Sequence, residues 1–189
     1  MPFTPLHYPF AYIMRKAGNK AHLDLDMAGL VIGSFTPDLE CPFFMIAGRL
    51  GILPPQAPYV QAHRLVLHSL LGSVTLGSLI SMLVVMALYT IFERDLMALG
   101  RSKPGLANLY AACTLGNLSH VLIDAVHHSY SPLLFPFTSE NVSAPVPLGD
   151  LWLGNLLVYA FVLLATALIL AYEWRSVRGR LLLRLLFDV

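Results

Sequence analysis

The sequence has 189 residues, of which 57% are hydrophobic and only 12% are charged, and its mean hydropathy is +0.68. A soluble domain carries about 25% charged residues, so this composition excludes an ordinary soluble protein. The net charge of +1 lacks the basic excess of a nucleic-acid-binding surface. The two cysteines form no C-x-x-C pair and predict no disulfide framework.

In chain order, a short apolar segment comes first, at residues 5–16. It would measure about 18 Å as a helix, too short for an ordinary span, and we expect a re-entrant or tilted helix. Four longer apolar segments follow, at residues 27–48, 69–92, 106–126 and 151–172. Because about 20 apolar residues cross a bilayer, the sequence predicts an all-α integral membrane bundle. It would form one domain over residues 1–189, with four transmembrane helices and a short N-terminal helix.

Two features modify this simple pattern. The first long segment is interrupted by T-P-D-L-E at residues 36–40, where Pro37 is expected to end the helix and leave Asp38 at the break. The last segment is followed by residues that pair arginines with leucines. We therefore expect residues 172–189 to form a cytoplasmic amphipathic tail at the membrane interface.

Basic residues predict the topology. Ten of the twelve lie in three connecting or terminal segments: Arg15, Lys16, Lys20, Arg94, Arg101, Lys103, Arg175, Arg178, Arg180 and Arg184. The positive-inside rule makes these segments cytoplasmic. Only Arg49 and Arg64 are left for the other side. The histidine-rich ends of the helices are then expected on the non-cytoplasmic side.

The third span carries the strongest metal-binding pattern. His120 and Asp124 are four residues apart, on one face of a helix, so both side chains can bind one divalent ion. An aspartate can also bridge two ions. His127 and His128 follow, and because neighbours on a helix point about 100° apart, we expect only one of them to face the metal. The alternative is a polar cluster at the helix end, solvated by headgroups.

A second block, H-R-L-V-L-H, contains His63, Arg64 and His68. A spacing of five residues does not suit one helix face, but it allows ligation if His63 lies in the loop before the helix. Each histidine alone could equally be an interfacial residue. Arg64 could bind a phosphate or carboxylate, or anchor the helix at the headgroups.

Three more residues are candidates for the site. Asp38 is expected to be a metal ligand with a catalytic role, the alternative being an N-cap for the next helix. Glu40 would be a supporting carboxylate or a general base. His7, near the N-terminus, would add a further ligand, whereas His22 is expected to be an ordinary solvated residue.

These blocks together resemble a prokaryotic family of membrane-bound metal-dependent hydrolases that includes a LexA-regulated inner-membrane member. The shared pattern is an early His, then P-D, H-R-x-x-x-H-S-L-L, G-x-x-S-H-x-x-x-D and a P-F segment. In this sequence it falls on His7, Pro37-Asp38, His63 to Leu71, Gly116 to Asp124, and Pro136-Phe137. The opening M-P-F-T-P-L-H also resembles a related family of unknown function. More distantly, the order of His and Asp residues is similar to zinc-dependent phospholipase C.

The resemblance implies a multi-pass protein of the plasma (inner) membrane that binds one or two ions of zinc, or of manganese. In phospholipase C the helix Asp bridges two zinc ions, a role that would fall to Asp124. The expected activity is hydrolysis of an ester or phosphoester of a lipid or lipid-linked substrate, with Asp38, Glu40 and Arg64 as the catalytic residues. The alternatives are a structural metal site without enzymatic activity, and transport of the metal or of protons.

Overall fold

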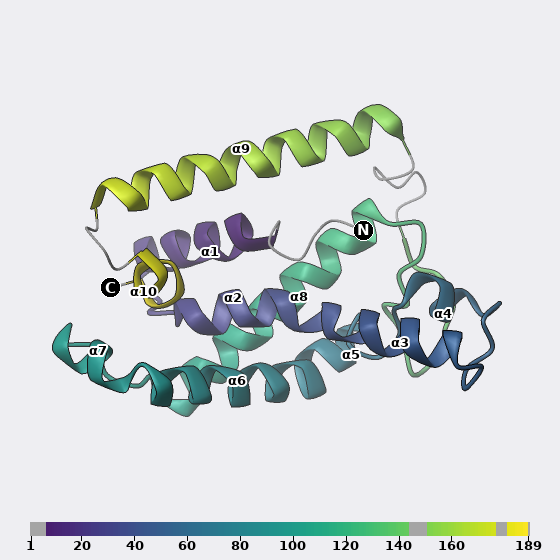
Figure 1. Cartoon of the computed structure of the whole chain (residues 1–189), viewed down its shortest axis with the longest axis horizontal. Coiled ribbons are helices and arrows are strands. Elements are labelled where there is room, and N and C mark those ends of the chain that lie inside the picture. The colour runs from purple at the N-terminus through teal and green to yellow at the C-terminus, as the bar shows by residue number, and fades with distance from the viewer. Residues whose placement is uncertain (1–6, 144–150, 177–180, 189) are drawn as a thin grey trace.

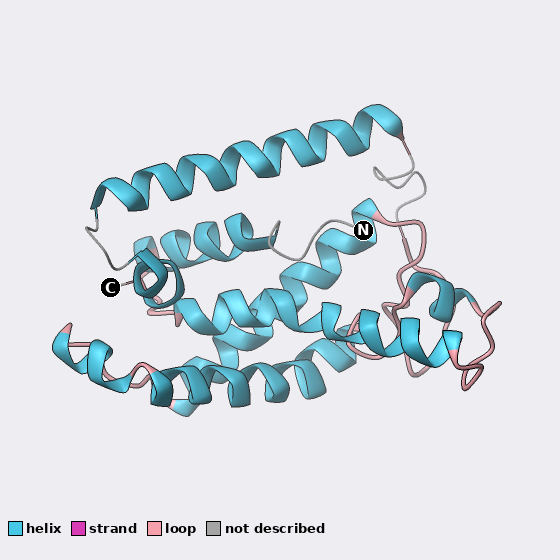
Figure 2. Ribbon diagram, viewed as in Figure 1, coloured by secondary structure: helices cyan, strands magenta, loops and turns pink. Residues whose placement is uncertain are grey.

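The computed structural model describes residues 7–143, 151–176 and 181–188. Within these ranges the chain forms helices and loops and no strand (Figure 2), as predicted for an all-α protein. Among the described residues, four helical stretches are long and apolar enough to cross a membrane: Met27–Arg49, Leu70–Ile91, Leu106–His127 and Trp152–Arg175. They agree with the four predicted spans to within three residues at each end, because hydropathy determines which segments can enter a bilayer.

The order of the elements is as follows: α1 (Tyr8–Lys20), α2 (Met27–Phe35), η2 (Thr36–Leu39), α3 (Glu40–Arg49), α4 (Pro58–Ala62), α5 (Leu70–Gly72), η3 (Ser73–Gly77), α6 (Ser78–Ile91), α7 (Glu93–Ala98), α8 (Leu106–His127), α9 (Trp152–Ser176) and α10 (Leu181–Phe187). Helix α2 lies in the middle of the bundle and contacts α1, α6 and α8. In Figure 1, α7 and α10 lie at one end of the molecule and α4 lies at the other.

The first span changes helix type at the expected place. Asp26 caps the start of α2 by accepting a hydrogen bond from the backbone N–H of Gly29 at 2.7 Å. The α-helix ends at Phe35, and Thr36–Leu39 form a 3₁₀ turn with Pro37 in its first positions. Proline has no N–H to continue the hydrogen-bonding pattern of the α-helix. The break therefore positions Asp38 differently from a side chain on a regular α-helix.

Close packing of α2 against α8 depends on small residues. A side chain at Gly33 would overlap the carbonyl oxygen of Cys113, and one at Gly116 would overlap the carbonyl oxygen of Leu30. Between helices in a membrane, such small residues let the backbones approach, and van der Waals packing then stabilises the pair. This approach brings the carbonyl of Ser34 on α2 within reach of His120 on α8.

Enlarging Gly33 should separate these two helices. We expect Gly33→Leu to lower the free energy of unfolding by at least about 1–3 kcal/mol, the usual cost of overpacking, and to reduce metal retention. Thermal unfolding in detergent measures the first effect. Gly105→Ala is the matched control, because a side chain there meets no atom within 4 Å. Equal stability of the two variants would contradict the conclusion that close packing of α2 against α8 requires a small residue at Gly33.

The C-terminal segment forms a helix, as its pattern of leucines and arginines predicts, and this helix packs against the rest of the protein. Helix α9 continues to Ser176, and α10 packs against the bundle. Phe187 is fully buried, with its ring 4.9 Å from that of Tyr89, and the Arg184 Nε donates to Glu173 Oε2 at 2.7 Å. The leucine and arginine pattern predicted an amphipathic helix, but its apolar face is covered by protein.

Candidate metal centre

Asp124 on α8 is surrounded by imidazole rings. Its Oδ2 lies 3.3 Å from His120 Nε2 and 3.7 Å from His68 Nε2. Its Oδ1 lies 3.5 Å from His128 Nε2 and 3.8 Å from His7 Nε2. The side chain of Asp124 is almost completely buried. The two oxygens of one carboxylate therefore face two different pairs of imidazole nitrogens.

Asp38 adds a second carboxylate on the Oδ2 side of Asp124. Its Oδ1 lies 3.6 Å from His120 Nε2 and 3.8 Å from His68 Nε2. The donor atoms of Asp38, His68 and His120 all lie within 4.8 Å of one another, and so do those of His7, His120 and Asp124. Ligands bound to one zinc ion are about 3–4 Å apart. Both groups are therefore compact enough to surround an ion.

Hydrogen bonds orient the two central histidines. The carbonyl oxygen of Ser34 accepts from His120 Nδ1 at 2.7 Å, and Glu40 Oε2 accepts from His68 Nδ1 at 3.0 Å. With the proton held on Nδ1, each neutral ring directs the lone pair of its Nε2 toward Asp38 and Asp124. Histidine ligands of metals are characteristically oriented in this way by a carbonyl or carboxylate behind the ring.

Glu40 also organises the loop that carries His68. Its Oε1 accepts hydrogen bonds from the backbone N–H groups of Val66 and Leu67, at 2.7 and 2.8 Å, and its Oε2 accepts from that of Leu65 at 3.0 Å. One buried carboxylate thus satisfies three N–H groups and one imidazole. The loop then ends at Ser69, whose side chain caps α5. These contacts favour the role of supporting carboxylate over that of general base.

Several polar atoms that point into the centre make no hydrogen bond within the described protein, although Asp124 Oδ2 also forms an ion pair with Arg64. Among the described residues, neither oxygen of Asp124 and neither Nε2 of His68 and His120 has a hydrogen bond. Buried polar groups are normally satisfied, and leaving several unpaired costs several kcal/mol. A divalent cation would satisfy all four atoms at once, so the donor set fits zinc, which binds imidazole and carboxylate.

His7 and His128 are suited to ligation by their protonation state. Burial lowers the pKa of His7 to about 3, and burial likewise lowers the pKa of His128 to about 3. Both rings are therefore neutral at pH 7, and a neutral imidazole has the free lone pair that a metal requires. The ring of His7 also stacks on that of His120, with centroids 3.9 Å apart.

Arg64 lies between this centre and a polar cavity. Its Nη2 is 3.0 Å from Asp124 Oδ2, and its side chain is only 4% exposed. The cavity measures about 310 Å³ and is lined by Gln61, Ala62, His63, Arg64, His128, Ser129 and Tyr130. A buried guanidinium at the wall of such a cavity can bind an anionic group.

Two predicted ligands lie elsewhere. His63 ends α4 in the left-handed region, with φ of 59°, and it lines the polar cavity but belongs to neither donor group. The Nε2 of His127 lies 3.2 Å from Asn155 Oδ1 on α9. His128 is thus the member of the pair that faces Asp124, because the helix ends at His127 and His128 is already extended. His22 is exposed, as expected.

Sequence reasoning did not identify two contributors to this arrangement. Ser34 acts through its backbone carbonyl, and because every residue has one, the residue type gives no signal of this contact. Asn155 was detectable in principle, since it is an amide near the start of an otherwise apolar span. Its contact with His127 draws that ring away from the centre.

Replacing each of the paired histidines in turn should separate their roles. We expect His128→Ala to weaken zinc binding by about tenfold or more, because one of the four imidazoles facing Asp124 is lost. His127→Ala should leave zinc affinity unchanged. Competition with a chelator measures both affinities. The assignment is wrong if His127→Ala causes the larger loss.

The comparisons with known proteins identify a family. The YdjM inner membrane protein family matches residues 8–187, nearly the whole chain. The searches of curated proteins and of solved structures found no match. The family match and the four apolar helices agree with the predicted multi-pass location in the inner membrane. The chain belongs to the YdjM inner membrane protein family.

Proposed function

We propose that this protein is a metal-dependent hydrolase that cleaves an ester, most favourably a phosphoester, of a lipid or lipid-linked substrate. The observation that carries the proposal is the position of Asp124, whose two oxygens face separate imidazole pairs beside a polar cavity. One or two zinc or manganese ions would be held by His7, Asp38, His68, His120, Asp124 and His128. A bound divalent ion supplies Lewis acidity and lowers the pKa of water, so that ester hydrolysis can proceed near neutral pH.

The residues of the chain have distinct tasks in this scheme. Asp38 and Asp124 supply negative charge that attracts the cations, and His68 and His120 supply oriented nitrogen donors. Arg64 would hold a phosphoryl or carboxylate oxygen at the cavity wall, where two N–H groups can bind one anion. Glu40 would keep His68 and its loop in position without touching the substrate.

The polar cavity favours an enzyme over the alternative, a purely structural ion. A structural site has all its positions closed by protein ligands, whereas a catalytic site leaves one open. Here His128 and Arg64 both face the centre and line the cavity. Transport is less favoured because it needs polar groups that continue from the site toward the cytoplasm. Ser81 and Asn117 are buried and polar, but the next buried residues in that direction, one helical turn away, are Val85 and Cys113.

We place the site toward the non-cytoplasmic face. This orientation is supported by the positive-inside rule. The loops at the metal centre carry few basic residues, while α7 and α10, which contain Arg94 and Arg184, lie at the other end of the molecule (Figure 1). Substrate would then enter from the outer headgroup layer.

The test is a hydrolysis panel on detergent-purified protein reconstituted with zinc or manganese. It should include a phosphomonoester, a phosphodiester and a carboxylic ester, each as a soluble compound and as a lipid. We expect metal-dependent turnover of at least one of them, lost in Asp38→Asn. Turnover that survives unchanged in Asp38→Asn would contradict the role given to Asp38 in the reaction. Metal-loaded protein that is inactive on every substrate would contradict the proposal and favour a structural ion.

A further inference from the structure

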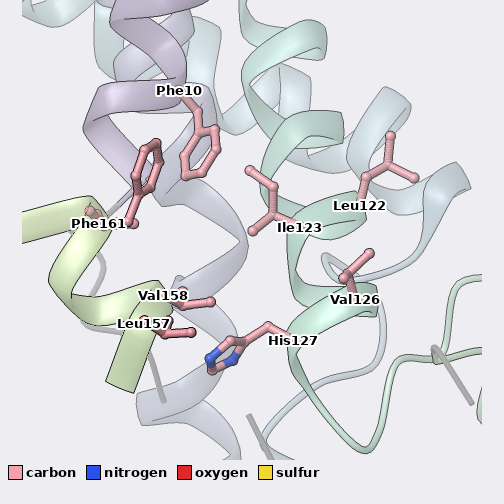
Figure 3. A pocket seen from close by; sticks show the side chains of 9 residues that line it. Phe10, Leu122, Ile123, Val126, His127, Leu157, Val158 and Phe161 are labelled. Atoms are coloured by element: carbon pink, nitrogen blue, oxygen red, sulfur yellow. The ribbon is translucent and has the colours of Figure 1, made fainter. Parts of the chain in front are cut away.

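An apolar cavity adjoins the metal centre on the other side of α8. It measures about 490 Å³ and lies between α1, α8 and α9 (Figure 3). Its walls are almost entirely hydrocarbon, and they are formed by Phe10, Leu122, Ile123, Val126, His127, Leu157, Val158, Phe161 and Val162. This volume is in the range of cavities that bind small ligands.

Neighbouring residues at the end of α8 line the two cavities. His127 lines the apolar cavity and His128 lines the polar one, and their rings are nearly perpendicular, with centroids 4.6 Å apart. One turn earlier the same division holds, since Ile123 faces the apolar cavity while the adjacent Asp124 faces the metal centre. A molecule that occupied both cavities would have one charged end and one hydrocarbon end.

The position of the cavity indicates where its occupant comes from. Helix α9 is long and apolar enough to span the membrane, yet it buries very little of its surface in the protein. Leu157 and Phe161 on the cavity wall are both more than half exposed. Because two of the three helices that enclose the cavity, α8 and α9, are long and apolar enough to span the membrane, we infer that the surroundings that reach it are bilayer lipids. Its hydrocarbon walls suit an acyl or prenyl chain and offer little to a polar molecule.

We propose that this cavity binds the hydrocarbon chain of the substrate, an amphiphilic lipid whose anionic headgroup lies in the polar cavity beside Arg64. This inference rests on the proposed function and adds the place where the hydrocarbon chain of the substrate binds and the side from which the lipid enters. The hydrocarbon chain of the lipid would pass His127, whose Nε2 is held by Asn155. It would then run along α9 from Leu157 to Val162, about 8 Å further into the membrane. The lipid would enter sideways from the bilayer.

Filling the cavity tests the proposal. Val158→Trp places a bulky ring inside it, whereas Leu163→Trp adds the same ring to an exposed position on the same helix. We expect Val158→Trp to lower kcat/KM about tenfold or more on a long-chain lipid substrate and to leave turnover of a soluble short-chain analogue and zinc content unchanged. Leu163→Trp should behave as the wild type. Equal loss on both substrates, or no loss on either, would overturn the proposal.

A binding measurement keeps this test independent of catalysis. Photo-crosslinking with a phospholipid that carries a diazirine near the end of its acyl chain should label Phe10 and Ile123 in the wild type. The same labelling should fall at least fivefold in Val158→Trp and persist in Leu163→Trp. If the protein proves to have no hydrolase activity but shows this labelling, the lipid site stands and the proposed reaction fails. Labelling confined to outward-facing residues such as Leu163 would overturn the lipid site.

Discussion

Replacing Asp124 with asparagine is expected to abolish metal binding and hydrolysis together. Asparagine has nearly the same volume, but it replaces one carboxylate oxygen with an amide nitrogen, which cannot bind a cation. Since both oxygens face imidazole pairs, either orientation of the amide removes a ligand from one side of the centre. Loss of a supporting residue alone costs about 10–100-fold in affinity, so we expect zinc affinity to fall by more than about 100-fold.

The control for this variant is Asp95→Asn, which removes one negative charge from an exposed position on α7. It should retain wild-type zinc affinity and turnover. Thermal unfolding of metal-free samples checks that Asp124→Asn is folded, because Arg64 loses its charged partner in that variant. A folded Asp124→Asn protein that binds zinc like the wild type would show that the carboxylate is not a ligand.

Replacing Glu40 with glutamine should cost both stability and metal affinity. The carboxylate accepts four hydrogen bonds, from three backbone N–H groups and from His68 Nδ1, and an amide has only one oxygen to accept them. Each buried donor left unpaired costs about 1–3 kcal/mol. We expect a lower unfolding temperature and zinc affinity reduced by about 10–100-fold, measured by calorimetry and chelator competition.

This experiment also distinguishes the two roles that the sequence left open for Glu40. If Glu40 were a general base, Glu40→Gln would lose turnover while zinc affinity and stability stayed unchanged. If it positions His68, added zinc should restore part of the turnover. Glu140→Gln, in an exposed loop, is the matched control and should change none of these quantities.

The spans and the pairing of His120 with Asp124 on one helix face were predictable because they depend on local patterns. Hydropathy over some 20 residues marks a span, and the spacing of His120 and Asp124 places them on one helix face. Pro37 similarly marks the end of α2 from its covalent structure. None of these inferences required knowledge of which elements meet in space.

The remaining features depend on contacts between distant parts of the chain. The loop from Arg64 to His68 folds around a carboxylate more than 20 residues earlier in the sequence, and this contact determines that His68 faces the centre. The conformation of His63, with its positive φ, also arises in this loop. The packing of α10 was missed for the same reason, since an amphipathic pattern does not reveal what will cover its apolar face.

The most direct test of a metal-dependent enzyme is elemental analysis of the detergent-purified protein beside Asp124→Asn. We predict one or two equivalents of zinc or manganese per wild-type chain and almost none in the variant. A chelator should remove this metal and abolish hydrolase activity, and adding the metal back should restore the activity. Folded wild-type protein that contains no divalent metal, and binds none when it is supplied, would contradict the account.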